Sequence, residues 1–232
     1  MLIKTKGIVI SQLKYGDNSL ICKVFTESEG LISVITNRNQ GKKNKRSVFF
    51  QTLSCIDIDI YFKQNKSLHR LKEVGFSQPM TNNEVNVVKS SIKFFLAEFL
   101  SKVVKEEGKN KPLFDFLWIQ AEKLNQTKEE LSYFHINFLY EFSEFLGIQP
   151  DLNEEGKFLD YREGTVVCNK PTHEEYSKPE ELSLLKEYFC HQNSLSKLHK
   201  STLLTTLIDY YRSQVGGFEK LKSKEILEVV FS

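Results

Sequence analysis

Paired carboxylates are the first side chains in this sequence that could take part in catalysis. Asp57 and Asp59 lie two residues apart in the run CIDIDIYF. On a β-strand both would project from the same face, as a metal-binding pair requires. The plainer interpretation is the solvent-facing side of an alternating strand whose other side carries Ile56, Ile58 and Ile60, and this interpretation is favoured.

The histidines and cysteines form no motif. The five histidines have no partner at the spacing of a catalytic or metal-binding motif: His69, His135, His173, His191 and His199. The four cysteines are scattered without a C-x-x-C pair: Cys22, Cys55, Cys168 and Cys190. Only tertiary folding could gather Cys168, His173, Cys190 and His191 into a metal site. We therefore expect separate reduced thiols, no bound metal and no cofactor.

Sequence signatures of nucleotide hydrolysis, acyl transfer and zinc proteolysis are missing. The chain has no G-x-x-x-x-G-K-[ST] loop, no G-x-S-x-G elbow and no H-E-x-x-H. We therefore expect a protein that is not an enzyme.

Clustered positive charge is the strongest chemical signal in the chain. The segment TNRNQGKKNKRSVFF (36–50) contains no acidic residue and five basic ones: Arg38, Lys42, Lys43, Lys45 and Arg46. Four more cations follow at Lys63, Lys66, Arg70 and Lys72. The net charge of +2 conceals an imbalance, since residues 1–80 hold 13 Lys and Arg against 6 Asp and Glu, and the remainder holds 19 against 24. Such a cluster is often a solvated connection, but it also attracts a phosphate backbone and displaces its counterions.

Residues 1–80 have the pattern of five short strands. The runs IKTKGIVISQLKYG, SLICKVFT, LISVITN, CIDIDIYF and SLHRLKEVGF are separated by turn signals, and no helical period interrupts them. A small barrel hides one face of such a sheet and removes its open edges. The pattern predicts an N-terminal five-stranded OB-fold β-barrel, a fold that often binds oligonucleotides, with an SH3-like barrel as the alternative.

From residue 84 the apolar residues recur at helical spacing. Helical runs predict an all-α helical domain over 81–232, so the expected fold class is α+β multidomain, with the boundary near SQPMTNNE. A short irregular or hairpin insertion is expected near 150–175, where KFLDY and TVVC flank Arg162-Glu163-Gly164. The aromatic residues of the helices are assigned to a bundle core. Those of the strands could stack on bases or fill the barrel: Tyr15, Phe25, Tyr61 and Phe62.

Targeting and membrane signals are not found in the sequence. The first residues, MLIKTKGIVISQLKYGD, lack the apolar segment and cleavage site of a signal peptide. No run of about 18 apolar residues occurs without charge. We expect a cytoplasmic protein with no membrane span.

The order of these features resembles the bacterial DNA repair protein RecO family. That family opens with an extended strand, a Tyr-Gly-acid-x-Ser turn, a Phe-Thr-x-x-x-Gly hairpin and a basic segment. The corresponding positions here are Tyr15, Gly16, Asp17 and Ser19, then Phe25, Thr26 and Gly30, then Lys42 to Ser47. NFLYEFSEFLGIQPDL is similar to the family's helix ending in Leu-Gly-x-x-Pro-x-Leu, and LIDYYRSQVGGFEKLKSKEIL to its closing helices.

The resemblance implies a recombination mediator with an OB-fold and a helical domain. RecO proteins bind single- and double-stranded DNA, anneal complementary strands, and with RecR help to load RecA on DNA coated by single-strand-binding protein (SSB). The C-terminal tail of SSB docks on RecO, in known cases through the helical domain. Many members carry four zinc-ligating cysteines after the Leu-Gly-x-x-Pro-x-Leu segment. This sequence keeps only Cys168 there, so zinc is not carried over, and the hairpin would replace the cross-link.

Three hypotheses follow. The leading one is a non-catalytic DNA-binding mediator whose nine cations, from Arg38 to Lys72, grip phosphates. The second is a protein-interaction scaffold whose basic barrel binds an acidic protein partner. The third is a metal-dependent enzyme that uses Asp57 and Asp59 or the Cys/His set. For the SSB tail, a groove in the helical domain would be edged by cations from this group: Lys102, Lys105, Lys123, Lys197, Lys200 and Arg212.

Overall fold

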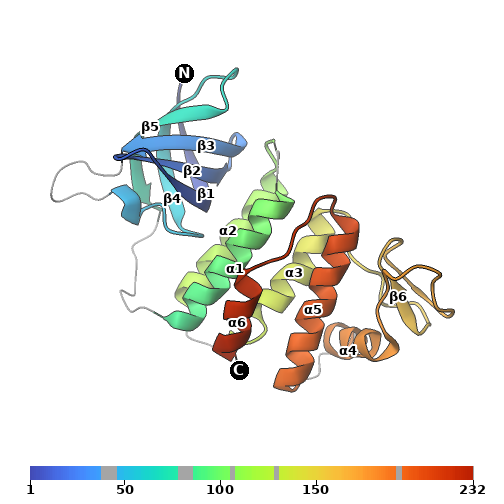
Figure 1. Ribbon diagram of the computed structural model, residues 1–232. Coiled ribbons are helices and arrows are strands. Elements are labelled where there is room, and N and C mark those ends of the chain that lie inside the picture. The colour runs from blue at the N-terminus through green and yellow to red at the C-terminus, as the bar shows by residue number, and fades with distance from the viewer. Residues whose placement is uncertain (38–45, 78–85, 105–107, 128–130, 192–194, 232) are drawn as a thin grey trace. The chain divides into compact units, whose positions relative to one another are not determined.

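The computed structural model describes residues 1–37, 46–77, 86–104, 108–127, 131–191 and 195–231. The chain divides into two compact units, Met1–Glu129 and Glu130–Ser232. Five strands and two helices form the first unit; four helices and a two-stranded hairpin are described in the second (Figure 1). Arg38, Lys42, Lys43, Lys45 and Lys105 lie outside the described residues.

Five strands form the N-terminal barrel. They are β1 (Leu2–Tyr15), β2 (Ser19–Thr26), β3 (Gly30–Asn37), β4 (Cys55–Tyr61) and β5 (Leu68–Phe76). In β3, and in β2 as far as Val24, the side chains alternate between buried and more exposed positions, because successive residues of a strand point to opposite faces. The 3-10 helix η1 (Arg46–Val48) precedes β4, and Phe50 just after it is fully buried in the barrel core.

The strand order closes the barrel as β1-β2-β3-β5-β4, with β4 pairing back onto β1. All neighbours are antiparallel except β3 and β5, which are parallel from Ser33 opposite Leu68 to Ile35 opposite Arg70. Strand β1 is long enough to pair with both β2 and β4, and its register shifts between Val9 and Ser11. This closed five-stranded barrel, followed by helices, confirms the predicted α+β class and the OB-fold.

Two helices complete the first unit. Helix α1 (Val87–Val103) begins at Asn86, whose side chain accepts a hydrogen bond from the Lys89 amide at 2.9 Å. Helix α2 (Lys111–Gln126) begins in the same way at Asn110, with a proline in its first turn. Its Phe114 ring lies 6.4 Å from that of Phe25 in β2, so α2 packs against the barrel through an aromatic contact.

The second unit is built around buried faces of its helices. These are α3 (Phe134–Phe145), α4 (Pro179–Phe189), α5 (Lys197–Gln214) and α6 (Ser223–Phe231). Tyr210 and Tyr211 of α5 are buried, and their hydroxyls donate to the main-chain carbonyls of Ile148 and Leu139 at 2.6 and 2.7 Å. The predicted bundle core thus holds Tyr210 and Tyr211 of α5 and Phe138 and Phe142 of α3, whereas Phe145 at the end of α3 is exposed.

A small hairpin interrupts the helices of the second unit. Strands β6 (Phe158–Asp160) and β7 (Thr165–Val167) pair antiparallel across Arg162 and Gly164. Gly164 has a φ of +71°, and a Cβ there would lie 2.8 Å from the Tyr210 hydroxyl, so only glycine fits this turn. The Gln214 side chain of α5 donates to the carbonyls of Tyr161 and Arg162, which fixes the hairpin to the helix.

Candidate nucleic-acid interface

A cavity of about 820 Å³ opens on the barrel surface where β3, β4 and β5 come together. We call it the basic cavity. Five of the described residues that line it are cations: Arg46, Lys63, Lys66, Arg70 and Lys72. The other lining residues are apolar or neutral: Ile35, Thr36, Asn37, Tyr61, Leu68 and Leu71. With no acidic side chain among these, the cavity is electropositive and suits a phosphate group.

Arg46 connects the end of the basic segment to two strands. Its guanidinium donates to the main-chain carbonyl of Lys72 in β5 at 3.1 Å and lies 3.5 Å from the hydroxyl of Thr36 in β3. A guanidinium carries five N–H donors, so donors remain for a ligand in the cavity. Arg46 is thus held in place at the edge of the cavity.

The turn between β4 and β5 carries Lys63 and Lys66, and hydrogen bonds of its main chain hold the turn in place. The Lys66 amide donates to the Lys63 carbonyl at 3.0 Å, and the Lys63 amide to Nδ1 of His69 at 3.4 Å. The His69 ring stacks on Phe62 at 4.5 Å between centroids. Burial lowers the pKa of His69, which favours the neutral ring that accepts this bond. Both lysine side chains are exposed to solvent.

A row of outward-facing residues runs from the basic cavity across the strands. Directly opposed partners share a face of the sheet. The register therefore places these residues in one row over five strands: Leu13 opposite Ile21, Ile21 opposite Ile35, Ile35 opposite Arg70, and Arg70 opposite Tyr61. We call this the outer row. It is apolar or aromatic except for Arg70, and Ile35, Arg70 and Tyr61 also line the cavity.

Two family matches cover nearly the whole chain. Residues 1–80 match "Recombination protein O N terminal", and residues 86–225 match "Recombination protein O C terminal". The chain belongs to the RecO family. Curated relatives named "DNA repair protein RecO" include those of Flavobacterium psychrophilum (36% identical), Phocaeicola vulgatus (35%) and Bacteroides fragilis (34%). Each match covers 100% of this chain and 100% of the relative.

In this RecO-family chain the structure separates the four aromatic residues that could stack on bases. Phe25 is fully buried in contact with Phe114, and Phe62 is partly buried on His69. Tyr15 and Tyr61 are exposed on the barrel surface. Of these four, only Tyr15 and Tyr61 are available to a base. The alternation of residues along each strand did not reveal this difference.

Asp57 and Asp59 face lysines across the β1–β4 pair. The register sets Asp57 opposite Lys6 and Asp59 opposite Lys4, and the Lys4 ammonium lies 3.4 Å from the Asp59 carboxylate. The K-x-K of β1 therefore matches the D-x-D of β4 as cross-strand charge pairs. This arrangement supports the plainer interpretation of the two carboxylates.

The Cys/His set does not come together in the described parts of the chain. No three His, Cys, Asp or Glu side chains there are grouped to hold a metal ion. His173 instead contacts Asp160 at 3.2 Å through Nε2, while its Nδ1 accepts the Glu175 amide at 3.2 Å. Cys168 and Cys190 are exposed and unbonded to each other. In this member of the RecO family, the hairpin is held by these hydrogen bonds.

The described helical cations suggested for the SSB tail lie on α1, α2 and α5, and two of them already have partners. Lys200 lies 4.1 Å above the Tyr133 ring and donates to the Ser132 hydroxyl at 3.0 Å, and Arg212 pairs with Asp209 at 2.7 Å. Lys197 is exposed in the first turn of α5. Lys102 and Lys123 lie in the last turns of α1 and α2.

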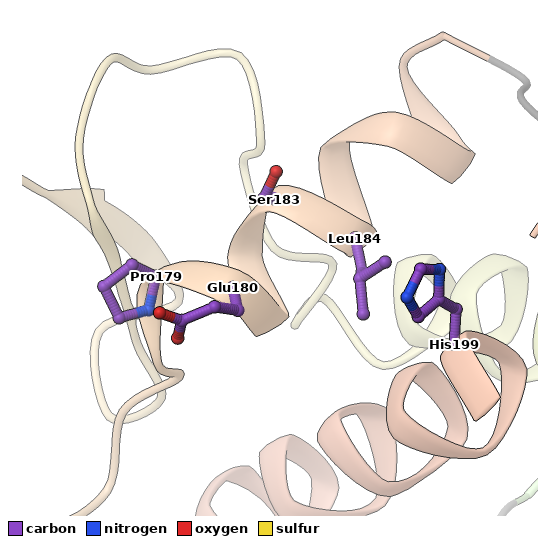
Figure 2. A pocket seen from close by; sticks show the side chains of 5 residues that line it. All are labelled: Pro179, Glu180, Ser183, Leu184 and His199. Atoms are coloured by element: carbon purple, nitrogen blue, oxygen red, sulfur yellow. The ribbon is translucent and has the colours of Figure 1, made fainter.

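A second cavity, of about 400 Å³, lies between α4 and the start of α5. Figure 2 shows Leu184 of α4 beside the His199 ring of α5, with Pro179 and Glu180 at the beginning of α4. Its described lining includes no lysine or arginine, so this cavity lacks the positive charge of the basic cavity.

Among the described helices, none is long and apolar enough to cross a membrane.

Proposed function

We propose that the chain is a non-catalytic DNA-binding mediator of repair and recombination, and that the basic cavity holds DNA phosphates. The observation that carries this proposal is the convergence of five cations from η1, β5 and the β4–β5 turn on one cavity of an OB-fold barrel. Membership of the RecO family and the name shared by its relatives, "DNA repair protein RecO", support the same role.

The basic cavity also suggests how the protein would act on DNA. A basic site that binds both single and double strands can hold complementary strands together, because the cations screen the repulsion between phosphates while bases pair. We infer that the protein anneals strands in this way, without bond chemistry. With RecR, it would help to load RecA on DNA coated by SSB, and its helical part would receive the acidic C-terminal tail of SSB.

The cations outside the described residues belong to the same proposal. Arg38, Lys42, Lys43 and Lys45 occupy the segment that ends at Arg46. Arg46, the next cation along the sequence, lines the cavity and donates to the Lys72 carbonyl. These four cations would extend the phosphate track that begins in the cavity.

Salt-dependent DNA binding tests the proposal. The variant Lys63→Glu/Lys66→Glu should weaken binding to a single-stranded oligonucleotide and lower the slope of log affinity against log salt by about 0.7 for each phosphate that the protein no longer neutralises. Lys109→Glu, an exposed lysine outside the cavity, is the matched control. Annealing of complementary oligonucleotides should fall in parallel. Unchanged affinity and slope in the double variant would show that the cavity does not bind phosphates.

Competition between single-stranded DNA and an acidic peptide distinguishes the DNA-binding mediator from the alternative, a protein-interaction scaffold. If DNA and an acidic peptide with the sequence of an SSB tail use different parts of the chain, an excess of single-stranded DNA should leave peptide binding intact. If the basic barrel instead binds the acidic partner, the two should displace each other.

A further inference from the structure

His69 is a buried histidine of β5 between two residues that line the basic cavity. Leu68 and Arg70 line that cavity, and successive residues of a strand point to opposite faces, so the His69 ring points away from it. His69 is only 4% exposed and lies opposite Val34 of β3, which is fully buried. Burying a polar side chain costs free energy unless it has a hydrogen-bond partner. The partner of His69 therefore indicates why a histidine occupies this position.

That partner is the main chain of the β4–β5 turn. Nδ1 of His69 accepts the Lys63 amide at 3.4 Å, so the proton of the neutral ring lies on Nε2. The ring also stacks on Phe62, with 4.5 Å between the centroids and 18° between the planes. Phe62 itself packs against the barrel core. His69 thus contacts two consecutive residues at the start of the turn, one through a hydrogen bond and one through its ring.

Three hydrogen bonds define the path of this turn. The Phe62 amide donates to the Met1 carbonyl at 2.9 Å, where the chain leaves β4, and the Lys66 amide donates to the Lys63 carbonyl at 3.0 Å within the turn. The bond from Lys63 to His69 joins this path to β5. Because Lys63 takes part in two of the three bonds, a shift of its main chain would displace Lys66 as well. Both lysine side chains line the basic cavity, so their positions depend on the main chain at Lys63.

We propose that His69 is a positioning residue for the basic cavity, because its ring fixes the main chain from which Lys63 and Lys66 reach DNA phosphates. The inference rests on the proposed function, since the placement of these lysines matters only if they bind phosphates. Two ammonium groups on a fixed turn can meet the phosphates of one strand without first ordering the main chain. Such preorganisation raises affinity by lowering the entropy that is lost on binding. His69 acts through the turn, with no contact to the DNA itself.

Two replacements separate the hydrogen bond of His69 from the packing of its ring. His69→Phe keeps a ring that can stack on Phe62 but removes the acceptor. His69→Asn gives up the ring but places a side-chain oxygen near the position of Nδ1. Titration of the full chain with an oligothymidylate at fixed salt compares both variants with the wild type.

The two variants should differ in affinity. His69→Phe should bind about two- to tenfold more weakly than the wild type, the value of one hydrogen bond, and His69→Asn should recover most of this loss. His191→Phe, at an exposed position, is the control and should bind as the wild type does.

A second background shows whether His69 acts through the two lysines. In Lys63→Ala/Lys66→Ala no ammonium group remains at the turn for His69 to position. Adding His69→Phe to this background should therefore change the affinity by less than about twofold. A general loss of structure would instead weaken binding by the same factor in both backgrounds.

The outcomes separate the positioning role from the phosphate site. Equal factors in the two backgrounds, or wild-type affinity of His69→Phe, would overturn the positioning role. Weaker binding by His69→Asn than by His69→Phe would do the same, because the ring and not the acceptor would then matter. Wild-type affinity of Lys63→Ala/Lys66→Ala would instead overturn the phosphate site at these lysines. If His69→Phe does not fold, nitrogen NMR of the wild-type ring still decides, because a proton on Nδ1 is incompatible with a bond accepted from Lys63.

Discussion

The guanidinium of Arg46 donates a hydrogen bond to the main-chain carbonyl of Lys72 at 3.1 Å. This bond joins the last cation of the basic segment to β5, the strand that also carries Arg70. It gives Arg46 a positioning role beside its charge, which a count of cations in the sequence could not show.

Arg46→Lys should separate the positioning role of Arg46 from its charge. Lysine keeps the charge, but its compact ammonium cannot reproduce the planar fork that spans Lys72 and Thr36. We expect DNA affinity to fall about two- to tenfold, the value of one hydrogen bond, with an unchanged salt slope. Lys72→Ala is a useful control, because it removes a charge but keeps the carbonyl acceptor. Wild-type affinity in Arg46→Lys would show that the bond to Lys72 is dispensable.

Asp160 should be a stability determinant of the hairpin. Its carboxylate contacts Nε2 of His173 at 3.2 Å and accepts the amides of Arg162 and Glu163 at 2.9 and 3.3 Å. Asp160→Ala should lower the free energy of unfolding by about 2–3 kcal/mol, because amide donors of a tight turn lose their acceptor. Urea unfolding followed by circular dichroism measures this change.

Three further measurements sharpen the test of Asp160. Asp209→Asn is the control, since the exposed pair with Arg212 should contribute less than about 1 kcal/mol. The double variant Asp160→Ala/His173→Ala should lose less than the sum of the single variants, because the two side chains share one interaction. Additive losses would contradict the pairing. A metal chelator should leave the wild-type unfolding midpoint unchanged if hydrogen bonds are the cross-links of the hairpin.

The four thiols should divide into two classes. Burial raises the pKa of both Cys22 and Cys55 to about 12, with Glu122 adding to the rise at Cys55 and Lys93 opposing it. The thiolate is the reactive form, so both should resist a disulfide reagent at pH 8 in the folded protein. Cys168 and Cys190 are exposed and should react. Rapid labelling of the variant Cys168→Ser/Cys190→Ser, without denaturant, would be incompatible with this core.

The second unit should lose stability in mild acid because of His135. Burial lowers the pKa of His135 to about 3, and the nearby positive charge of Lys200 acts in the same direction. The unfolded chain, with an ordinary histidine pKa of about 6.5, therefore binds the proton that the folded chain excludes. Stability should fall as the pH drops below about 6.5, by up to about 1.4 kcal/mol per pH unit.

Urea unfolding at several pH values between 7 and 4 measures the effect of His135. His135→Gln cannot take up the proton, so this contribution to the slope of unfolding free energy against pH should vanish, whatever its effect on stability at pH 7. His191→Gln, at an exposed position, should keep the wild-type slope. A wild-type slope in His135→Gln would refute the assignment.

Local sequence patterns determined the barrel strands and their buried faces. Ile56, Ile58 and Ile60 alternate with two aspartates, and the structure buries all three isoleucines at 0–1% exposure. Period-two alternation is a local property, so a single strand reveals it. Helical spacing identified α1, α2 and α3 for the same reason, and charge alone located the cations of the barrel.

Tertiary structure decided which of those cations share a site and what lies beside them. Arg70 lies next to Ile35 only because β5 pairs parallel to β3, and next to Tyr61 only because β4 lies on its other side. Phe25 and Tyr61 are both strand aromatics, yet one is core and the other surface. The first placement depends on pairing between Ile35 and Arg70, which are far apart in the chain, and the second on the register that the β4–β5 turn sets. Neither follows from the alternation within a single strand.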